Sequence, residues 1–137
     1  MLGRSERDIV KALEVSEAEY RTLLENAPAV IVTFDLKGKI TSINRAVEEF
    51  GFRKDEIVGK YLLKFIPKSY WQRILKDLIN VSRGEIVRGE VELNTPKGKK
   101  IAEYRSSPIR MEEKVVGIQA ILRDITERKK AEERIRA

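Results

Sequence analysis

The sequence contains neither cysteine nor histidine. A disulfide framework, a thiolate nucleophile and the usual protein ligands of zinc, copper and haem are therefore excluded. A Ser-His-Asp or Cys-His catalytic group cannot form, and no histidine is available for phosphorylation. The paired glutamates at 48–49, 112–113 and 132–133 are sequence neighbours on expected surface, so they indicate no acid–base site. We expect no enzymatic activity, no catalytic residue and no metal site.

Long apolar runs are also missing. No stretch approaches the roughly 18 apolar residues of a membrane-spanning helix. The start, M-L-G-R-S-E-R-D, lacks the apolar centre of a signal peptide. We therefore expect no membrane span in this chain and a cytoplasmic location. The residues that are present, 42% hydrophobic and 36% charged over 137 positions, are typical of one globular domain with its own core.

The charge balance is basic, with 28 lysines and arginines against 22 acidic residues. Residues 61–100 hold nine basic and four acidic side chains and account for most of the net charge of +6. A nucleic-acid site would use the stretch from Lys97 to Lys100 together with Arg83 and Arg88. Nucleic-acid binders more often show a basic stripe with exposed aromatic side chains. We favour a solvated basic face and expect no nucleic-acid partner.

The N-terminal region has the pattern of two short helices. Ser5 with Asp8, and Ser16 with Glu19, each place a capping oxygen three positions before an acidic residue. Pro28 ends the region, because the residue before a proline disfavours the helical conformation. The apolar residues at helical spacing are Ile9, Val10 and Leu13 in the first helix and Tyr20, Leu23 and Leu24 in the second.

The remaining pattern predicts an α+β domain with an antiparallel sheet. Residues 29–34 and 40–43 read as a hairpin, and 87–93, 101–109 and 115–122 as three further strands joined by turn residues. Between these groups, Asn44 caps a short helix that Gly51 ends, and residues 55–59 form another helical turn. A capping box at Ser69 and Gln72 opens the longest helix of this region, which ends at Gly84. Its apolar face holds Trp71, Ile74, Leu75 and Leu78.

In this order, several fragments resemble a PAS domain, from about Tyr20 to Glu133. They are Y-R-T-L-L-E-N-A-P, D-L-K-G-K-I-T-S-I-N-R-A, F-G-F-R-K-D-E-I-V-G-K, T-P-K-G-K, S-S-P-I-R and G-I-Q-A-I-L-R-D-I-T-E-R-K-K. The D-I-T-E-R ending is the most specific of them. The resemblance implies a five-stranded antiparallel sheet with short helices and one longer helix on one face. It also implies a sensory role of the kind found in sensor histidine kinases and related multidomain regulators.

The resemblance divides the chain into three parts. Residues 1–19 form an N-terminal helical extension that serves as a dimerisation cap, 20–123 the PAS sensor domain, and 124–137 the start of a C-terminal signalling helix. PAS domains typically precede a kinase, cyclase or other output domain. Because the sequence stops soon after the last helix begins, we expect a fragment of a longer protein whose output domain is absent.

The cofactor classes of PAS domains can be compared with this sequence. Light-sensing flavin members use a cysteine in a G-x-x-C motif, and Leu62 holds that position in the run from Gly59 to Phe65. We therefore expect no cysteinyl-flavin photochemistry. Because the sequence has no histidine, we also expect no haem held by a histidine in the long helix. Tyr70 is a weak haem ligand candidate. We predict no cofactor, while an unidentified small molecule or a non-covalent flavin stays open.

A small-molecule pocket between the longest helix and the sheet is one interpretation of the apolar pattern. Its expected lining is Ile43, Phe65, Trp71, Leu75, Leu78, Val91, Tyr104 and Leu122. We favour the other interpretation, a filled core, since any core shows apolar residues at such spacing. The indole N–H of Trp71 needs a partner if it is buried. Asn44 is interpreted as a helix cap rather than a ligand contact.

The D-I-T-E-R segment is interpreted as a signal relay made of Asp124, Ile125, Thr126, Glu127 and Arg128. An Asp124 cap with Glu127 three residues later fixes where the strand ends and the helix begins, and Ile125 packs back onto the domain. The alternative is a well-capped connector without a signalling role. Arg128, Lys129 and Lys130 are expected on a solvated face.

Two hypotheses of function follow. In the first, the chain is a sensor that dimerises and relays a small-ligand or conformational signal to an output domain such as a histidine kinase. Ile9, Leu13 and Leu24 would form the dimer contact, against a second copy or the outer face of the sheet. In the second, the chain is a ligand-free module for protein–protein interaction.

Overall fold

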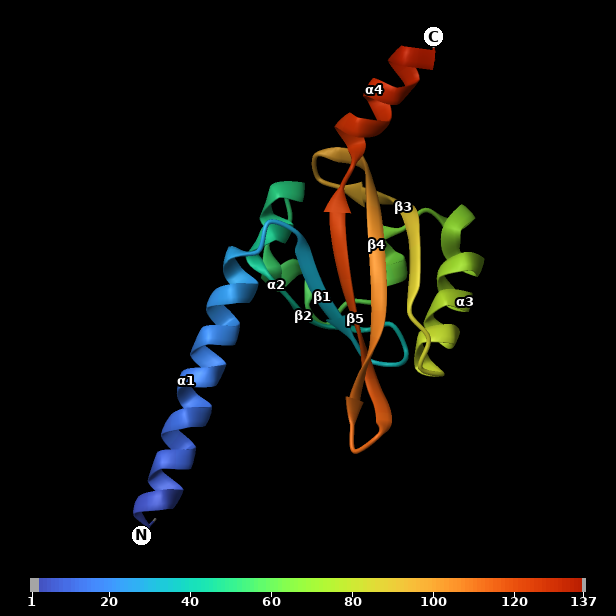
Figure 1. The fold of residues 1–137 in the computed structure, drawn as a ribbon. Coiled ribbons are helices and arrows are strands. Elements are labelled where there is room, and N and C mark those ends of the chain that lie inside the picture. Colours follow the sequence, from blue (N-terminus) through green and yellow to red (C-terminus); the bar gives the residue numbers. More distant parts are fainter. Residues whose placement is uncertain (1–2, 137) are drawn as a thin grey trace.

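A computed structural model describes residues 3–136. Its centre is a five-stranded antiparallel sheet in the order β2-β1-β5-β4-β3 (Figure 1). The strands are β1 (Val30–Phe34), β2 (Ile40–Ile43), β3 (Val87–Thr95), β4 (Gly98–Met111) and β5 (Lys114–Asp124). The predicted α+β fold is thereby confirmed. The last two strands are longer than expected, because their hairpin continues past the sheet.

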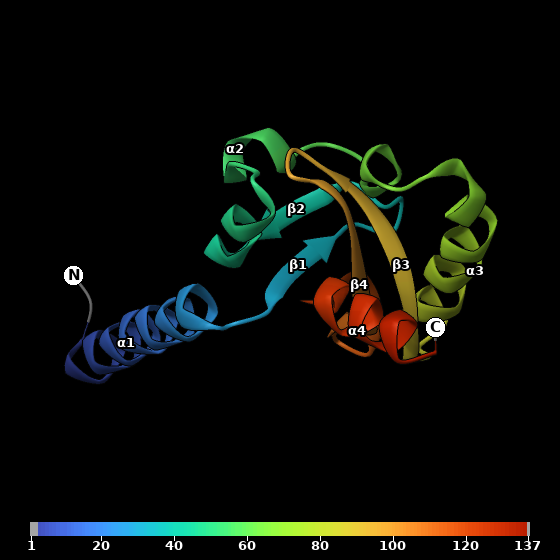
Figure 2. The same ribbon diagram turned by 90° about the horizontal axis from the view of Figure 1, so that it is seen from above.

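Short helices and one longer helix cover one face of the sheet (Figure 2). They are η1 (Arg45–Phe50), α2 (Lys54–Ile57), η2 (Leu62–Phe65), η3 (Lys68–Tyr70) and α3 (Trp71–Ser82). Two further helices, α1 (Arg4–Asn26) and α4 (Thr126–Arg136), project away from the sheet (Figure 1). Within the described residues, no helix combines the length and apolarity needed to cross a membrane.

The prediction of two N-terminal helices is wrong, because α1 is one continuous helix from Arg4 to Asn26. Residues 4–26 contain no proline or glycine, so nothing ends the first helix, and Ser16 lies in the interior. At 1.5 Å per residue the helix is about 35 Å long. None of its described residues is buried.

The side chain of Asn44 ties the end of α1 to the sheet. The expected helix cap is not formed, since this side chain makes no capping hydrogen bond to η1. Its Nδ2 instead donates to the carbonyl oxygens of Leu24 at 2.7 Å and Ala29 at 3.0 Å, and its Oδ1 accepts from the Ile31 N–H at 2.8 Å. With 2% of its surface exposed, this amide satisfies three backbone groups that would otherwise lack partners. Gly51 ends η1 in the left-handed conformation, as expected.

Glu25 provides a second tie at the same end of α1. Its carboxylate accepts from the backbone N–H of Arg45 at 3.1 Å and lies 2.9 Å from the Lys54 ammonium. The hydrogen bond from Lys54 outweighs partial burial and lowers the pKa of Glu25 below its usual value. The ionised form of Glu25 therefore stabilises the folded state.

We predict that Glu25→Gln lowers the free energy of unfolding by about 0.5–1 kcal/mol at pH 7. Because the folded pKa lies below the unfolded one, the carboxylate stabilises at pH values above the unfolded pKa. This contribution is lost as the pH falls through the folded pKa. Urea unfolding from neutral to acidic pH measures the difference, with Glu56→Gln on the exposed side of α2 as the control. A difference between wild type and Glu25→Gln that does not change with pH would contradict the assignment.

Candidate ligand cavity and signalling junction

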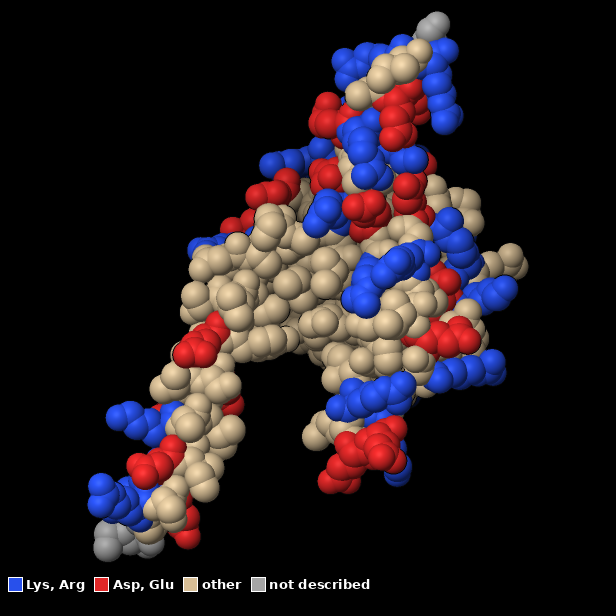
Figure 3. All heavy atoms as spheres, viewed as in Figure 1, with Lys and Arg blue, Asp and Glu red and all other residues tan. Residues whose placement is uncertain are grey.

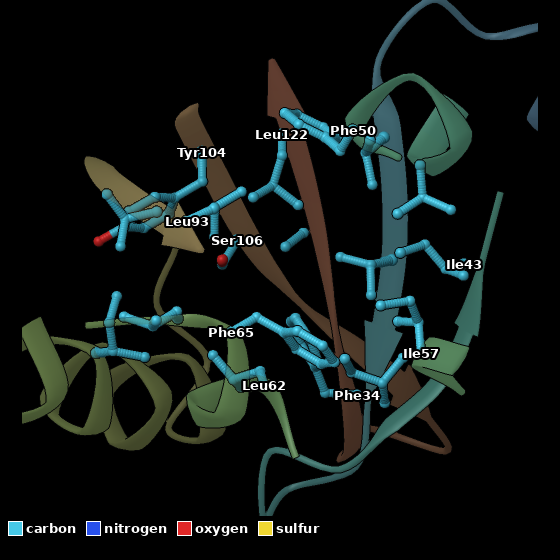
Figure 4. A pocket seen from close by; sticks show the side chains of 18 of the residues that line it. Phe34, Ile43, Phe50, Ile57, Leu62, Phe65, Leu93, Tyr104, Ser106 and Leu122 are labelled. Atoms are coloured by element: carbon cyan, nitrogen blue, oxygen red, sulfur yellow. The ribbon is translucent and has the colours of Figure 1, made fainter. Parts of the chain in front are cut away.

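A cavity of about 120 Å³ lies between the sheet and the helical layer. Its walls come from both layers, and Figure 4 shows Phe34, Ile43 and Leu122 of the sheet facing Leu62 and Phe65 of η2. The lining is Val30, Val32, Phe34, Ile40, Ile43, Val47, Phe50, Phe52, Ile57, Leu62, Phe65, Ile66, Ile74, Asp77, Leu78, Val81, Val91, Leu93, Tyr104, Ser106, Ala120 and Leu122. The arrangement is an apolar chamber with a few polar groups, the usual character of a small-molecule site.

The structure brings six of the eight expected pocket residues to this cavity. They are Ile43, Phe65, Leu78, Val91, Tyr104 and Leu122. Trp71 and Leu75 are not part of the lining. Leu75 is 45% exposed, because the buried face of α3 runs through Ile74, one position earlier. That the cavity holds a ligand stays a prediction.

Trp71 has a structural contact instead. Its indole Nε1–H donates to the carbonyl oxygen of Ile66 at 2.8 Å, which supplies the partner that a part-buried indole needs. The predicted capping box of Ser69 and Gln72 is absent, and α3 begins after Tyr70 without a side-chain cap. The turn η3 leads directly into α3, so the start of α3 lies later than the pattern of Ser69 and Gln72 predicts.

The sequence analysis missed three cavity phenylalanines, Phe34, Phe50 and Phe52. The ring of Phe52 meets that of Phe65 edge-on, with centroids 5.2 Å apart and an interplanar angle of 78°. Phe50 and Phe52 flank a glycine at a helix end, where no periodic pattern marks which side chains point inward. The F-G-F run at residues 50–52 could have indicated buried side chains, because it places two large apolar residues in a turn.

Tyr104 carries the polar corner of the cavity. Its ring crosses the backbone of Gly89 on the neighbouring strand, and its hydroxyl donates to the Asp77 carboxylate on α3. Burial and this hydrogen bond raise the pKa of Tyr104 to about 12. A Cβ atom at position 89 would lie 2.7 Å from the tyrosine oxygen and 2.9 Å from Cζ. Glycine is therefore needed at position 89 for the ring to reach α3.

The expected relay segment joins β5 to α4 through part-buried hydrogen bonds. The Asp124 carboxylate accepts from the Thr126 N–H at 2.9 Å and from its hydroxyl at 2.5 Å. The Thr126 oxygen accepts in turn from the Ile101 N–H at 2.9 Å, and the Ile125 N–H donates to the Ile101 carbonyl at 2.8 Å. Ile125 and Thr126 are both buried. The start of α4 is thereby fastened to β4.

Glu127 does not complete the predicted capping box. It is the second residue of α4 rather than the third, which is too early for its carboxylate to reach back to the cap. Its side chain is 83% exposed and lies 3.9 Å from the Lys130 ammonium. The role of the Thr126 hydroxyl was not predicted, and it is this group that bonds to the sheet, at Ile101.

Arg128 and Lys129 were expected on a solvated face. Arg128 is exposed, as expected, whereas Lys129 is half-buried, and both lie beside acidic side chains of the sheet. Lys129 Nζ lies 2.9 Å from a Glu90 oxygen, and Arg128 lies 3.3 Å from Glu103 and 4.0 Å from Glu90. Glu90 and Glu103 are directly opposite each other on β3 and β4. Like charges at such positions repel, so the two cations offset that repulsion. The Glu90 carboxylate raises the pKa of Lys129 above its usual value.

The three residues expected at a dimer contact lie in different surroundings. Ile9 and Leu13 are 61% and 60% exposed on α1, whereas Leu24 is half-buried where α1 joins the domain. Figure 3 shows a broad uncharged surface between α1 and α4. The outward-facing pairs Ile31–Ile121 and Thr33–Gln119 of β1 and β5 lie on this side of the sheet.

The family model described as PAS fold matches residues 24–130, and the chain belongs to this family. A methyl sulfide methyltransferase-associated sensor of Methanosarcina acetivorans is 25% identical over 131 residues. That match covers 88% of this chain but 12% of the sensor, so this chain spans a small part of that relative.

Two solved structures extend the comparison. The PAS domain of an HTR-like protein from Haloarcula marismortui is 25% identical, with a TM-score of 0.74. The alignment covers 87% of this chain and 99% of that domain. The PAS domain of the Cronobacter turicensis RpfR quorum-sensing receptor, in complex with BDSF, is also 25% identical, with a TM-score of 0.62. This alignment covers 74% of the present chain and 97% of the RpfR domain.

We predict that Gly89→Ala destabilises the domain by about 1–3 kcal/mol, because the added methyl group displaces the Tyr104 ring. Gly3→Ala is the control, since a Cβ there meets no atom within 4 Å. Chemical denaturation of both variants measures the cost. In a Tyr104→Leu background the cost of Gly89→Ala should largely disappear. An equal cost with and without the tyrosine ring would show that the contact is not its cause.

Proposed function

We propose that this chain is the sensory, non-catalytic module of a longer signalling protein. A small ligand in the cavity changes the packing of β3, and β3 changes the position of α4. The observation that carries the proposal is the placement of Gly89 and Glu90. These consecutive residues lie on opposite faces of β3, Gly89 under the Tyr104 ring of the cavity and Glu90 against Lys129 of α4.

The cavity supports the ligand half of the proposal. It has apolar walls from both layers and holds about 120 Å³ of space, whereas a well-packed core has few voids larger than a water molecule. The RpfR relative, whose PAS domain is solved in complex with BDSF, shares the fold and 25% of aligned residues. The structure thus favours the sensor hypothesis over the ligand-free interaction module.

The contacts of β3 support the relay half. Tyr104 lies over Gly89 on the cavity side and bonds to α3 through Asp77. Arg73 of α3 donates to the backbone carbonyl of Glu90, so α3 also holds β3 directly. On the outer face, the Glu90 carboxylate pairs with Lys129. A movement of α3 or Tyr104 therefore acts on the strand that carries the anchor of α4.

The relay predicts that Tyr104→Phe, which removes the bond to Asp77, alters hydrogen exchange in α4 by about twofold or more. In a Glu90→Gln background the α4 response should fall to less than about half, because the charge that holds Lys129 is gone. The α4 response is measured as hydrogen exchange in peptides spanning residues 126–136, by mass spectrometry.

Glu92→Gln is the matched control for the relay experiment. Glu92 lies two residues along β3 on the same face, and its described ion pair is with Lys99 of β4 at 4.0 Å rather than with a cation of α4. The α4 response to Tyr104→Phe should be unchanged in this background. A response that survives Glu90→Gln, or that is lost equally with Glu92→Gln, would refute the route through Glu90.

We propose that α1 pairs with a second copy of the chain. Four of its exposed apolar residues are Ile9, Leu13, Tyr20 and Leu23. Their successive spacings of four, seven and three residues place them along one side of the helix, as in a coiled-coil seam. The uncharged outer face of β1 and β5 lies beside the end of α1 and offers the same copy a second surface. Leu24 positions the helix through its half-buried contact with the domain.

We predict that Leu13→Asp weakens dimerisation by about tenfold or more, because it places a charge in the apolar seam. Val15→Asp is the matched control, since Val15 is 49% exposed on another side of α1. Sedimentation equilibrium measures both dissociation constants. Deleting residues 1–19 should leave a folded monomer, and a truncated protein that still dimerises would disprove the role of α1.

The output of the longer protein is proposed from the relatives. The methyl sulfide methyltransferase-associated protein is a sensor, and this chain matches a small part of it. A histidine kinase or cyclase linked after α4, and a cytoplasmic location, accord with the PAS family and stay proposals. Arg128 and Lys129 would be the residues through which such a domain is rotated or released.

A further inference from the structure

The chemistry of the cavity wall restricts what it can hold. Of the 22 described residues that line it, three carry a polar side-chain atom: Asp77, Tyr104 and Ser106. Ser106 lies on β4, between Val87 of β3 and Ala120 of β5. Figure 4 shows its hydroxyl oxygen pointing into the space between the sheet and η2. The polar groups therefore gather on the β4 side of an otherwise apolar chamber.

The hydrogen-bonding capacity of these groups favours a ligand that donates. The Tyr104 hydroxyl already uses its proton on Asp77. The Asp77 carboxylate keeps lone pairs for a second donor. The Ser106 hydroxyl, which also lines the cavity, can both donate and accept. A single hydroxyl on the ligand would match this wall.

The charge of the wall disfavours an anion. Asp77 is the one ionisable carboxyl in the described lining, and that lining contains no lysine or arginine. A buried carboxylate on the ligand would face this like charge, and burying a poorly paired charge is costly. The nearest cation, Arg73, lies outside the lining and already interacts with Tyr104 and with the Glu90 carbonyl. An ammonium group would lose its water shell for one carboxylate that Tyr104 already engages. An uncharged polar group is the remaining match.

The size of the cavity limits the ligand to about one ring. A cavity of about 120 Å³ is close to the roughly 150 Å³ apolar cavity that accommodates benzene in another protein. Four phenylalanines, at positions 34, 50, 52 and 65, contribute to the lining. Their ring edges and faces suit an aromatic guest packed in offset or edge-on geometry.

We propose that the cavity selects a small, uncharged aromatic molecule with one hydroxyl group, a phenol, and discriminates against carboxylates. The phenolic hydroxyl donates to the Asp77 carboxylate and accepts from Ser106, while the ring packs among the phenylalanines. This assignment rests on the proposed function, since it requires that the cavity binds a ligand. The selectivity resides in Asp77 and Ser106.

The test is a titration of the ¹⁵N-labelled chain with phenol, benzene and benzoate at neutral pH, followed by NMR. Phenol should shift the backbone amides around Tyr104 and Ser106 and bind about tenfold or more tightly than benzoate. Benzene should fall between them, because it fills the cavity without making the hydrogen bond. This comparison uses the unmodified chain, so it does not depend on whether any variant folds.

Two variants test the residues named. Ser106→Ala should reduce phenol affinity toward that of benzene and leave benzene affinity unchanged. Asp77→Asn keeps an acceptor for Tyr104 but removes the charge, so benzoate should come within about threefold of phenol. Asp55→Asn is the matched control, because Asp55 carries the same charge on an exposed part of α2 and should change no affinity.

The outcomes separate this inference from the proposed function. Benzoate binding as tightly as phenol, or unchanged discrimination in Asp77→Asn, would overturn the selectivity while leaving a ligand-binding cavity. Phenol affinity that is insensitive to Ser106→Ala would likewise overturn it. If none of the three probes shifts the cavity amides, both the ligand-sensing function and the selectivity fail.

Discussion

The packing of the Tyr104 ring across Gly89 is the contact on which the rest of the arrangement depends. Because position 89 has no side chain, the ring can cross β3 and place its hydroxyl on Asp77 of α3. This bond connects the helical layer to the sheet at the polar corner of the cavity. The next residue, Glu90, points to the opposite face and meets α4. One short segment of β3 thus contacts the cavity residue Tyr104 on one face and the C-terminal junction on the other.

The two projecting helices are attached to the domain in different ways. The end of α1 is fixed by the buried amide of Asn44, which bonds to three backbone groups. The start of α4 is likewise fixed by part-buried hydrogen bonds of the buried Thr126, but its next turn forms ion pairs at the surface of the sheet. Exposed ion pairs contribute little stability and rearrange at small cost. We infer that α4 pivots about a fixed start, whereas α1 keeps its angle.

Much of the fold could be predicted from residue patterns, and the site only in part. Strand alternation and turn residues identified all five strands, and helical spacing identified α3. The two-helix interpretation of α1 failed because a capping pattern at Ser16 does not end a helix that lacks a breaker. Phe50 and Phe52 escaped prediction because residues in irregular turns carry no periodicity. The roles of Asn44, Thr126 and Lys129 depend on partners far away in the sequence, and no local pattern contains that information.

We propose that occupancy of the cavity changes the attachment of α4. The most direct measurement follows the backbone amides of Arg128 and Lys129 by NMR while phenol fills the cavity, together with the amides of β4. We expect the α4 amides to shift along with the cavity amides and to give the same dissociation constant, although no ligand atom reaches them. Cavity amides that saturate while those of α4 stay unchanged would contradict it.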